Sequence, residues 1–272
     1  MFSLNLPMTW PDPPLFGRAR LRHEVGPVRI ASKDETISDW NTQGSTQWDG
    51  FRHVQRPGHG HFGGIPDPSH GVHHWAVRGI AGRGVLADVA RWRQSVGRPL
   101  DPGGADPITP AELLDCLDTC GVSVRTGDIL LIRTGWLEWY QARDPATRAR
   151  LSDRGVLRSA GLEASEDMAR LLWDMHVAAV AADNPALEVW PIGAGHDRDY
   201  LAEVRADPRR EHEIQLHVRI LAMLGIPIGE LFDLERLAAD CAADGRYECF
   251  LTSAPANLPG GVASPPNALA LK

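Results

Sequence analysis

The most informative stretch of this sequence is Gln43-Gly44-Ser45-Thr46-Gln47-Trp48-Asp49-Gly50-Phe51-Arg52-His53. It brings amide, carboxylate, guanidinium and imidazole groups together in one short segment. The glycines at positions 44 and 50 allow the backbone to adopt tight or unusual conformations there. This composition is typical of a functional site and is rare in a hydrophobic core. We therefore expect the rest of the chain to be organised around this segment.

The overall composition is that of a globular protein. The chain has 272 residues, which is enough to bury a sizeable core. Its net charge of −7 argues against nucleic acid or an anionic membrane as a partner. The N-terminus lacks the residue order of a signal peptide, and no apolar run has the length of a membrane span. We expect a cytoplasmic protein whose partner is a small-molecule substrate.

Local patterns predict several helices and strands. Thr109-Pro110-Ala111-Glu112 is typical of a helix start, with a capping box and a proline at the first helical position. The apolar run from Ile129 to Ile132 predicts a central strand. Further predictions are helices over 165–175 and 214–224 and strands over 85–89, 177–182 and 246–252. Two polar surface excursions are predicted at 141–160 and at 186–212, the second of which contains His196.

The central segment resembles the signature of the cyclase family that includes bacterial kynurenine formamidases and isatin hydrolases. That signature reads His-x-Gly-Thr-His-x-Asp-x-Pro-x-His, and its histidine positions fall here on Gln43, Gln47 and His53, with its aspartate on Asp49. The Gln-Trp-Asp-Gly-Phe-Arg-His form resembles a subgroup of larger proteins within that family. Three other blocks resemble family blocks in the same order: 79–89, 127–136 and 217–230.

The resemblance implies an α/β protein with the swivelling β/β/α cyclase-like fold, a mixed sheet or barrel flanked by helices. No internal repeat and no clearly polar linker divides the chain, so we expect a single domain over 1–272. The proline-rich residues 1–40 are expected to form an extended arm, and residues 254–272 a proline-rich tail. Because such arms often cover a partner subunit, we expect a homodimer or a homotetramer.

The resemblance also implies roles for individual residues. In the family, two histidines and the aspartate bind a divalent metal with a later His and Glu, and the last histidine is the general acid or base. Carried over, Asp49, His217 and Glu230 are the metal ligands if a metal is bound, and His53, Asp49 and Glu230 are catalytic. Because amides are weak metal ligands, Gln43 and Gln47 in place of histidines leave open both a metal-free site and a site for manganese, zinc or magnesium.

Other side chains are candidates for binding the substrate. Gln43, Gln47 and Arg52 can donate hydrogen bonds to a carbonyl or a developing oxyanion. Trp48 and Trp136 can form flat apolar walls, and the alternative for both is a place in the core. Arg133 at the end of a predicted strand is a further candidate, and its alternative to contacting the substrate is an internal ion pair.

These residues support a hydrolase that acts on an amide or lactone bond of a small cyclic or aromatic substrate, with His53 as general acid or base. Two alternatives stay open. One is a metal-independent cyclase or lyase, and the other is a binder of small molecules whose catalytic site has decayed. The four polar groups of Asp49, His53, His217 and Glu230 favour an enzyme, because burying them is costly.

Overall fold

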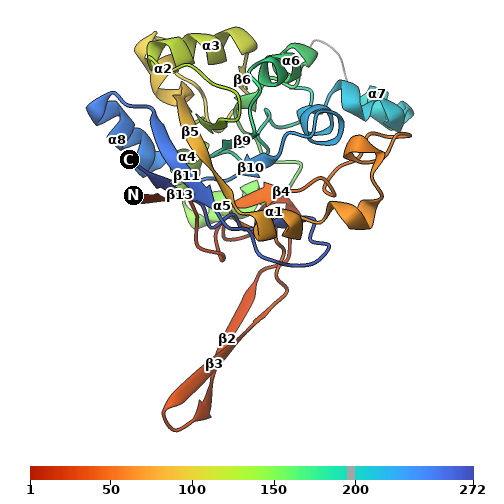
Figure 1. Cartoon of the computed structure of the whole chain (residues 1–272), viewed down its shortest axis with the longest axis vertical. Coiled ribbons are helices and arrows are strands. Elements are labelled where there is room, and N and C mark those ends of the chain that lie inside the picture. Colours follow the sequence, from red (N-terminus) through yellow and green to blue (C-terminus); the bar gives the residue numbers. More distant parts are fainter. Residues whose placement is uncertain (195–199) are drawn as a thin grey trace.

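A curled, nine-stranded mixed sheet forms the centre of the computed structural model, which describes residues 1–194 and 200–272 (Figure 1). His196 of the predicted polar insertion lies outside the described residues. In sheet order the strands are β1 (Phe2–Ser3), β13 (Leu269–Leu271), β11 (Glu248–Ser253), β5 (Ile80–Asp88), β7 (Ile129–Arg133), β9 (Ala179–Ala182), β10 (Ile228–Glu230), β4 (Gln47–Asp49) and β12 (Ala263–Ser264). Strands β5, β7, β9 and β10 are parallel, and the outer pairs are antiparallel.

Helices flank this sheet (Figure 1). The α-helices are α1 (His73–Arg78), α2 (Val89–Ser95), α3 (Pro110–Thr119), α4 (Trp136–Gln141), α5 (Pro145–Leu151), α6 (Glu166–Asp174), α7 (Tyr200–Ala206) and α8 (Glu235–Asp244). The shorter turns are η1 (Leu15–Gly17), η2 (Phe62–Gly64), η3 (Asp67–His70), η4 (Pro208–Glu213) and the π-helix η5 (Val218–Met223). No helix in the described part of the chain combines the length and apolar character needed to cross a membrane.

The central strand β7 explains how the sheet is stabilised. Ile129 and Leu131 pack into the cluster that contains Trp48 and Phe232, while Leu130 packs into the cluster on the opposite face. A strand that is covered on both faces reads as a continuous apolar run, which is why the sequence predicted it correctly. The helix predicted at Thr109 is also confirmed, since the side chains of Thr109 and Glu112 form the capping box of α3.

Both chain ends contribute to the sheet. Residues 254–272, expected as a tail, contain β12, which pairs with β4, and β13, which pairs with β11. Within the predicted arm 1–40, β1 pairs with β13. Short strands such as these make little periodic signal of their own, because their position is fixed by backbone pairing with distant strands.

Within the arm, β2 (Arg22–Arg29) and β3 (Ser32–Ser38) form a hairpin that projects away from the body (Figure 1). Its residues are exposed on both faces of the ribbon apart from Ser38 at its root. A further short parallel pair, β6 (Pro107–Ile108) with β8 (Gly161–Leu162), lies outside the main sheet. The predicted helix over 214–224 is present as η5, in which the N–H of Leu224 donates to the carbonyl of Arg219, the wider spacing of a π-helix.

Candidate functional site

The site is built where β4 and β10 pair. The antiparallel register places Gln47 opposite Glu230, so the two side chains lie on the same face of the sheet. Gln47 Nε2 donates to Glu230 Oε2 at 2.6 Å. Two residues further along β4, Asp49 is on the same face, whereas Trp48 between them points to the opposite face. Period-two alternation thus separates the polar site from the apolar core.

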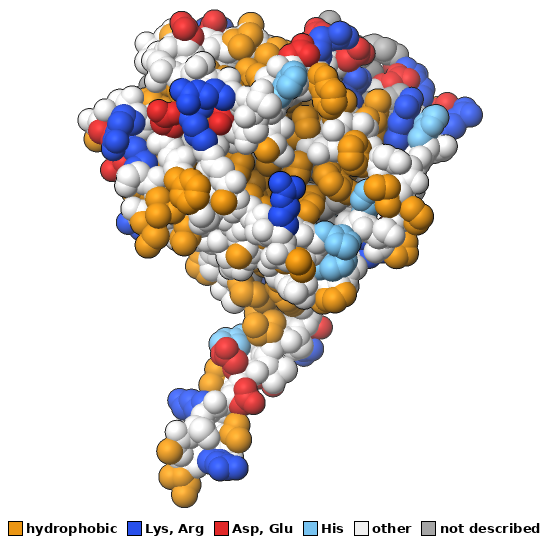
Figure 2. Space-filling model, in the orientation of Figure 1, with side chains coloured by type: hydrophobic (Ala, Val, Ile, Leu, Met, Phe, Trp, Pro, Cys, Tyr) orange, Lys and Arg blue, Asp and Glu red, His pale blue; other side chains and the backbone are white. Residues whose placement is uncertain are grey.

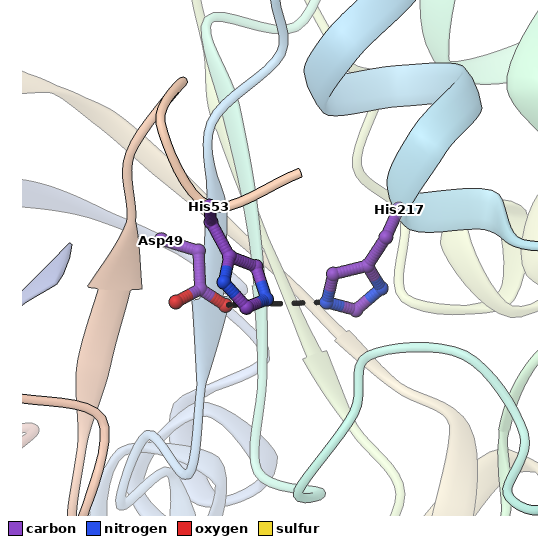
Figure 3. Close-up of side chains that lie close together, drawn as sticks. All are labelled: Asp49, His53 and His217. Carbon is purple, nitrogen blue, oxygen red and sulfur yellow. Dashed lines mark ion pairs between the residues drawn. The ribbon is translucent and has the colours of Figure 1, made fainter. Parts of the chain in front are cut away.

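Two histidines lie close to one oxygen of Asp49. His53 Nε2 and His217 Nε2 each lie 3.9 Å from Asp49 Oδ2, and Figure 3 shows both rings turned toward that carboxylate. One ligand atom from each of the three residues lies within 4.8 Å of the others. Asp49 is fully buried, and the His53 side chain is 27% exposed, so His53 is the member of this cluster that solvent reaches. The sequence placed all three residues in the site, and the fold brings them together.

His217 is held between two carboxylates. Its Nδ1 lies 3.0 Å from Glu188 Oε2 and its Nε2 lies 3.0 Å from Glu230 Oε1. Burial alone would lower the pKa of His217, but the charges and hydrogen bonds of Glu188 and Glu230 outweigh it and raise this pKa well above 6.5. Glu188 was missed in the sequence, because it lies on a loop without a motif and only the fold brings it to His217.

Gln43 connects the other side of the cluster. Its Nε2 donates to Asp49 Oδ1 at 2.7 Å and lies 3.1 Å from His53 Nδ1. Burial is the main reason why the pKa of His53 is lowered from 6.5, and the positive charges of His217 and Arg18 lower it further, against the opposing effect of Asp49. His53 is therefore mostly neutral at neutral pH.

Glu230 has a pKa that suits proton transfer near neutrality. Burial, followed by the nearby negative charge of Asp49, raises the pKa of Glu230 from 4.5 to about 7, although hydrogen bonding to His217 acts in the opposite direction. A group with such a pKa is populated in both its protonated and its ionised form at neutral pH.

Arg18 is a second residue that the sequence did not indicate. It precedes the β2–β3 hairpin, and its guanidinium donates to the backbone carbonyl of Gln43. Its burial lowers its pKa, whereas the charges of Glu230 and Asp49 raise it. Arg18 also lies over the ring of Phe16, 5.0 Å from its centre. A single arginine among loop residues carries no recognisable pattern, so only the fold could place this cation beside the site.

Four other candidate residues make contacts elsewhere. Trp48 is fully buried, packs edge-on against Phe232 and donates its Nε1 hydrogen to a serine hydroxyl. Trp136 is also fully buried and stacks on Tyr140. Both tryptophans thus occupy the core positions that the sequence left open as the alternative.

The two arginine candidates are engaged in ion pairs. Arg52 pairs with Asp67, at 2.6 and 3.0 Å, and also donates to the Gly260 carbonyl. Arg133 makes ion pairs with three carboxylates, those of Asp88, Glu138 and Glu235. The Arg133 guanidinium is thus surrounded by carboxylates, and the Arg52 guanidinium is directed toward the loop of Asp67. Among the described residues, neither guanidinium contacts the cluster around Asp49.

The donor set is compatible with a divalent metal. Asp49 Oδ2 and Gln47 Oε1 are buried and have no hydrogen-bond partner among the described residues. An unpartnered buried carboxylate oxygen is costly, and a cation beside it would remove that cost. One carboxylate with imidazole nitrogens is a common donor set for zinc, manganese or iron-type ions. The cluster of Asp49, His53 and His217, with Glu230 beside His217, is therefore a candidate metal centre.

The curled mixed sheet with flanking helices defines an α/β protein of the cyclase-like class. A family model described as "Putative cyclase" matches residues 4–189, which is more than half of the chain. The chain belongs to this family. The comparison with curated proteins gave no match.

Solved structures agree with this assignment. A crystal structure described as a novel cyclase is 31% identical, with a TM-score of 0.81, and the match covers 100% of this chain and 88% of that chain. Isatin hydrolase A from Labrenzia aggregata, bound to benzyl benzoate, is 17% identical with a TM-score of 0.65, covering 99% and 91%. Isatin hydrolase A from Ralstonia solanacearum is 15% identical with a TM-score of 0.68, covering 100% and 91%. The two isatin hydrolases share the fold with this chain.

Proposed function

We propose that this chain is a hydrolase that cleaves an amide or lactone bond of a small cyclic or aromatic substrate. The observation that carries the proposal is the unpartnered oxygen of Asp49, buried between His53 and His217. Burying a carboxylate oxygen without a partner destabilises the fold, so the group is expected to have a function. Buried titratable groups of this kind commonly act in acid–base chemistry. The names of the two isatin hydrolases support a cyclic amide as the first substrate to test.

The proposed reaction needs one proton acceptor and one group that stabilises the carbonyl oxygen. Water adds to the carbonyl carbon, its proton passes to a carboxylate of Asp49 or Glu230, and the carbonyl electron pair moves onto oxygen. When the C–N or C–O bond breaks, its electron pair stays on the leaving atom, which takes the proton back from the carboxylate. The products are a carboxylic acid and an amine or alcohol. His53, at the exposed side of the cluster, is the general acid or base nearest to the substrate.

A divalent metal would fit into this scheme. Asp49, His217 and Glu230 would hold it, and when bound it would polarise the carbonyl and lower the pKa of water. With a metal bound, His53 would still contact the substrate. Glu188 would still orient His217 through its contact with Nδ1.

The glutamine contacts favour a second candidate function. Gln43 and Gln47 donate hydrogen bonds to Asp49 and Glu230, so both carboxylates already have a partner that is not a metal. This arrangement supports a metal-independent cyclase or lyase, in which the same acid–base groups move a proton without adding water.

An assay with matched variants tests the proposal. Isatin, an N-formylaniline and an aryl lactone would be incubated with the native chain, with His53→Ala and with Gln55→Ala, whose side chain is exposed two residues away. We expect hydrolysis of at least one substrate, a loss of about 10²-fold or more in kcat for His53→Ala, and no loss for Gln55→Ala. Turnover that His53→Ala leaves intact would contradict the assignment of the site.

A further inference from the structure

We propose that Gln43 fixes the ring proton of His53 on Nε2, so that His53 meets the substrate as a hydrogen-bond donor. Gln43 would then be a positioning residue that acts through His53. The part that concerns the substrate rests on the proposed hydrolase function, whereas the position of the proton is a property of the free protein. The tautomer of His53 depends on which end of the Gln43 amide faces its neighbours.

The contact with Asp49 decides the orientation of the amide. An ionised carboxylate only accepts hydrogen bonds, and Gln43 lies 2.7 Å from Asp49 Oδ1. The amide nitrogen must face that oxygen, because the opposite orientation would bring two acceptors into contact. The backbone of Gln43 is also held, since its N–H donates to the side chain of Asn41 and its carbonyl accepts from Arg18. Both the backbone and the side chain of Gln43 are thus held by hydrogen bonds.

The same amide nitrogen determines the tautomer of His53. It lies 3.1 Å from His53 Nδ1, and an amide NH2 group has two hydrogens to donate. One hydrogen goes to Asp49 and the other to Nδ1, which must therefore accept. In a neutral imidazole, the nitrogen that does not accept carries the proton. The proton of His53 consequently lies on Nε2.

The position of Nε2 shows what this proton can do. Nε2 lies 3.9 Å from Asp49 Oδ2, which is too far for a hydrogen bond. The Nε2–H of His53 is therefore not bonded to Asp49 and belongs to a side chain that is 27% exposed. It can donate to the carbonyl oxygen of a bound amide or lactone, while a carboxylate takes the proton of water.

NMR of the protein with 15N-labelled histidine tests the assignment without any substrate. Two-bond 1H–15N correlations distinguish the Nε2–H from the Nδ1–H tautomer, and the His53 signals are those that disappear in His53→Ala. We expect the Nε2–H pattern in the native chain. In Gln43→Glu, a carboxylate can accept from Nδ1–H, so we expect a shift of His53 toward the Nδ1–H pattern. The matched control is Gln55→Glu, which makes the same change on an exposed side chain and should leave the pattern unchanged.

Two results would overturn the proposal: an Nδ1–H pattern in the native chain, or a folded Gln43→Glu variant with the native pattern. Circular dichroism would establish whether Gln43→Glu is folded. If it is not, Gln43→Leu replaces it. Because leucine can neither donate nor accept a hydrogen bond, we expect a changed ratio of the two His53 tautomers in that variant. These outcomes are separate from the proposed function, because a chain with the expected tautomer and no hydrolytic activity would contradict the function alone.

Discussion

Asp49 and Glu230 set the electrostatics of the site at the scale of single residues. Both carboxyl groups are buried, and each accepts a hydrogen bond from a glutamine amide. Two cations lie beside them: His217, whose pKa Glu188 and Glu230 raise, and Arg18, whose pKa the charges of Glu230 and Asp49 act to raise. This arrangement keeps several titratable groups in contact in an interior where a lone charge would be costly.

The first prediction concerns Glu230→Gln and pH. The carboxyl of Glu230 has a folded pKa of about 7, above its unfolded value of 4.5, so the folded state holds a proton that the unfolded state has lost in this range. The stability that this group contributes is therefore lost as pH rises from 4.5 to 7. The pKa of His217 is raised in part by Glu230, and this contribution to stability is also lost with rising pH.

We accordingly expect the free energy of unfolding to depend less steeply on pH in Glu230→Gln than in the native chain. Urea unfolding at pH values from 5 to 8 measures this difference, with the exposed Glu24→Gln as a control of the same chemistry. Parallel pH curves for the native chain and Glu230→Gln would show that Glu230 titrates normally.

The sequence indicated six of the eight residues described at the site. Gln43, Gln47, Asp49 and His53 stand in one segment, and the resemblance to the family added His217 and Glu230. Two members had no such signal: Arg18, which lies before the hairpin, and Glu188, which lies on a loop. Their roles depend on contacts across many residues of chain, and single-sequence patterns report on neighbours within a turn or a strand.

At the scale of elements, the close approach of β10 to its neighbours holds the site in register. A Cβ atom at Gly229 would lie 2.5 Å from Ala181 Cβ, 2.6 Å from the Phe232 ring and 2.9 Å from the Trp48 ring. Gly229 stands directly before Glu230 and pairs with Trp48 across β4. The absence of a side chain there allows the strand to carry its carboxylate against the Gln47 amide.

The second prediction is that Gly229→Ala destabilises the fold and disturbs the site. We expect a loss of about 1–3 kcal/mol in the free energy of unfolding, since the added methyl group forces the core to shift. Gly82→Ala on β5 is the control, because a Cβ there meets only atoms at 3.8 Å. Thermal and urea unfolding of the two variants would be compared. Equal stability of both would contradict the packing argument.

The elements themselves differ in how far sequence could predict them. The strand over 129–132 and the helix after Thr109 were predicted because burial on two faces and a capping box leave local signals. The strands β12 and β13 were expected as a tail, because their place is decided by pairing with β4 and β11. Likewise, the hairpin β2–β3 was expected only as an extended arm.

At the scale of the whole molecule, the hairpin projects from the rest of the described chain with both faces of its ribbon exposed (Figure 2). It carries four exposed apolar side chains, Val25, Val28, Ile30 and Ile37. An isolated two-stranded hairpin is marginally stable in water. The hairpin has three basic and three acidic residues and is therefore neutral, whereas the whole chain has a net charge of −7. A neutral hairpin is not repelled by the acidic surface of a second copy, which favours contact between the two.

The third prediction is a dimer formed through this hairpin. We propose that the arm packs against a second copy, and we expect Val28→Asp combined with Ile30→Asp to shift the chain toward monomer in sedimentation equilibrium. Val77→Asp on α1, which is 74% exposed, is the control. A native chain that stays monomeric at high concentration would contradict this proposal. The hairpin is inserted between Arg18 and Gln43, which are hydrogen-bonded to each other, so a dimer contact would also act on the site.

The most direct test of the whole account is the mass of the product formed in 18O-labelled water. With a cyclic aryl amide or an aryl lactone as substrate, the proposed reaction adds the oxygen of one water molecule to the carbonyl carbon. We predict a carboxylic acid product that is heavier by one 18O atom, formed by the native chain and lost in His53→Ala. A product that carries no label would contradict hydrolysis and would assign the site to cyclase or lyase chemistry.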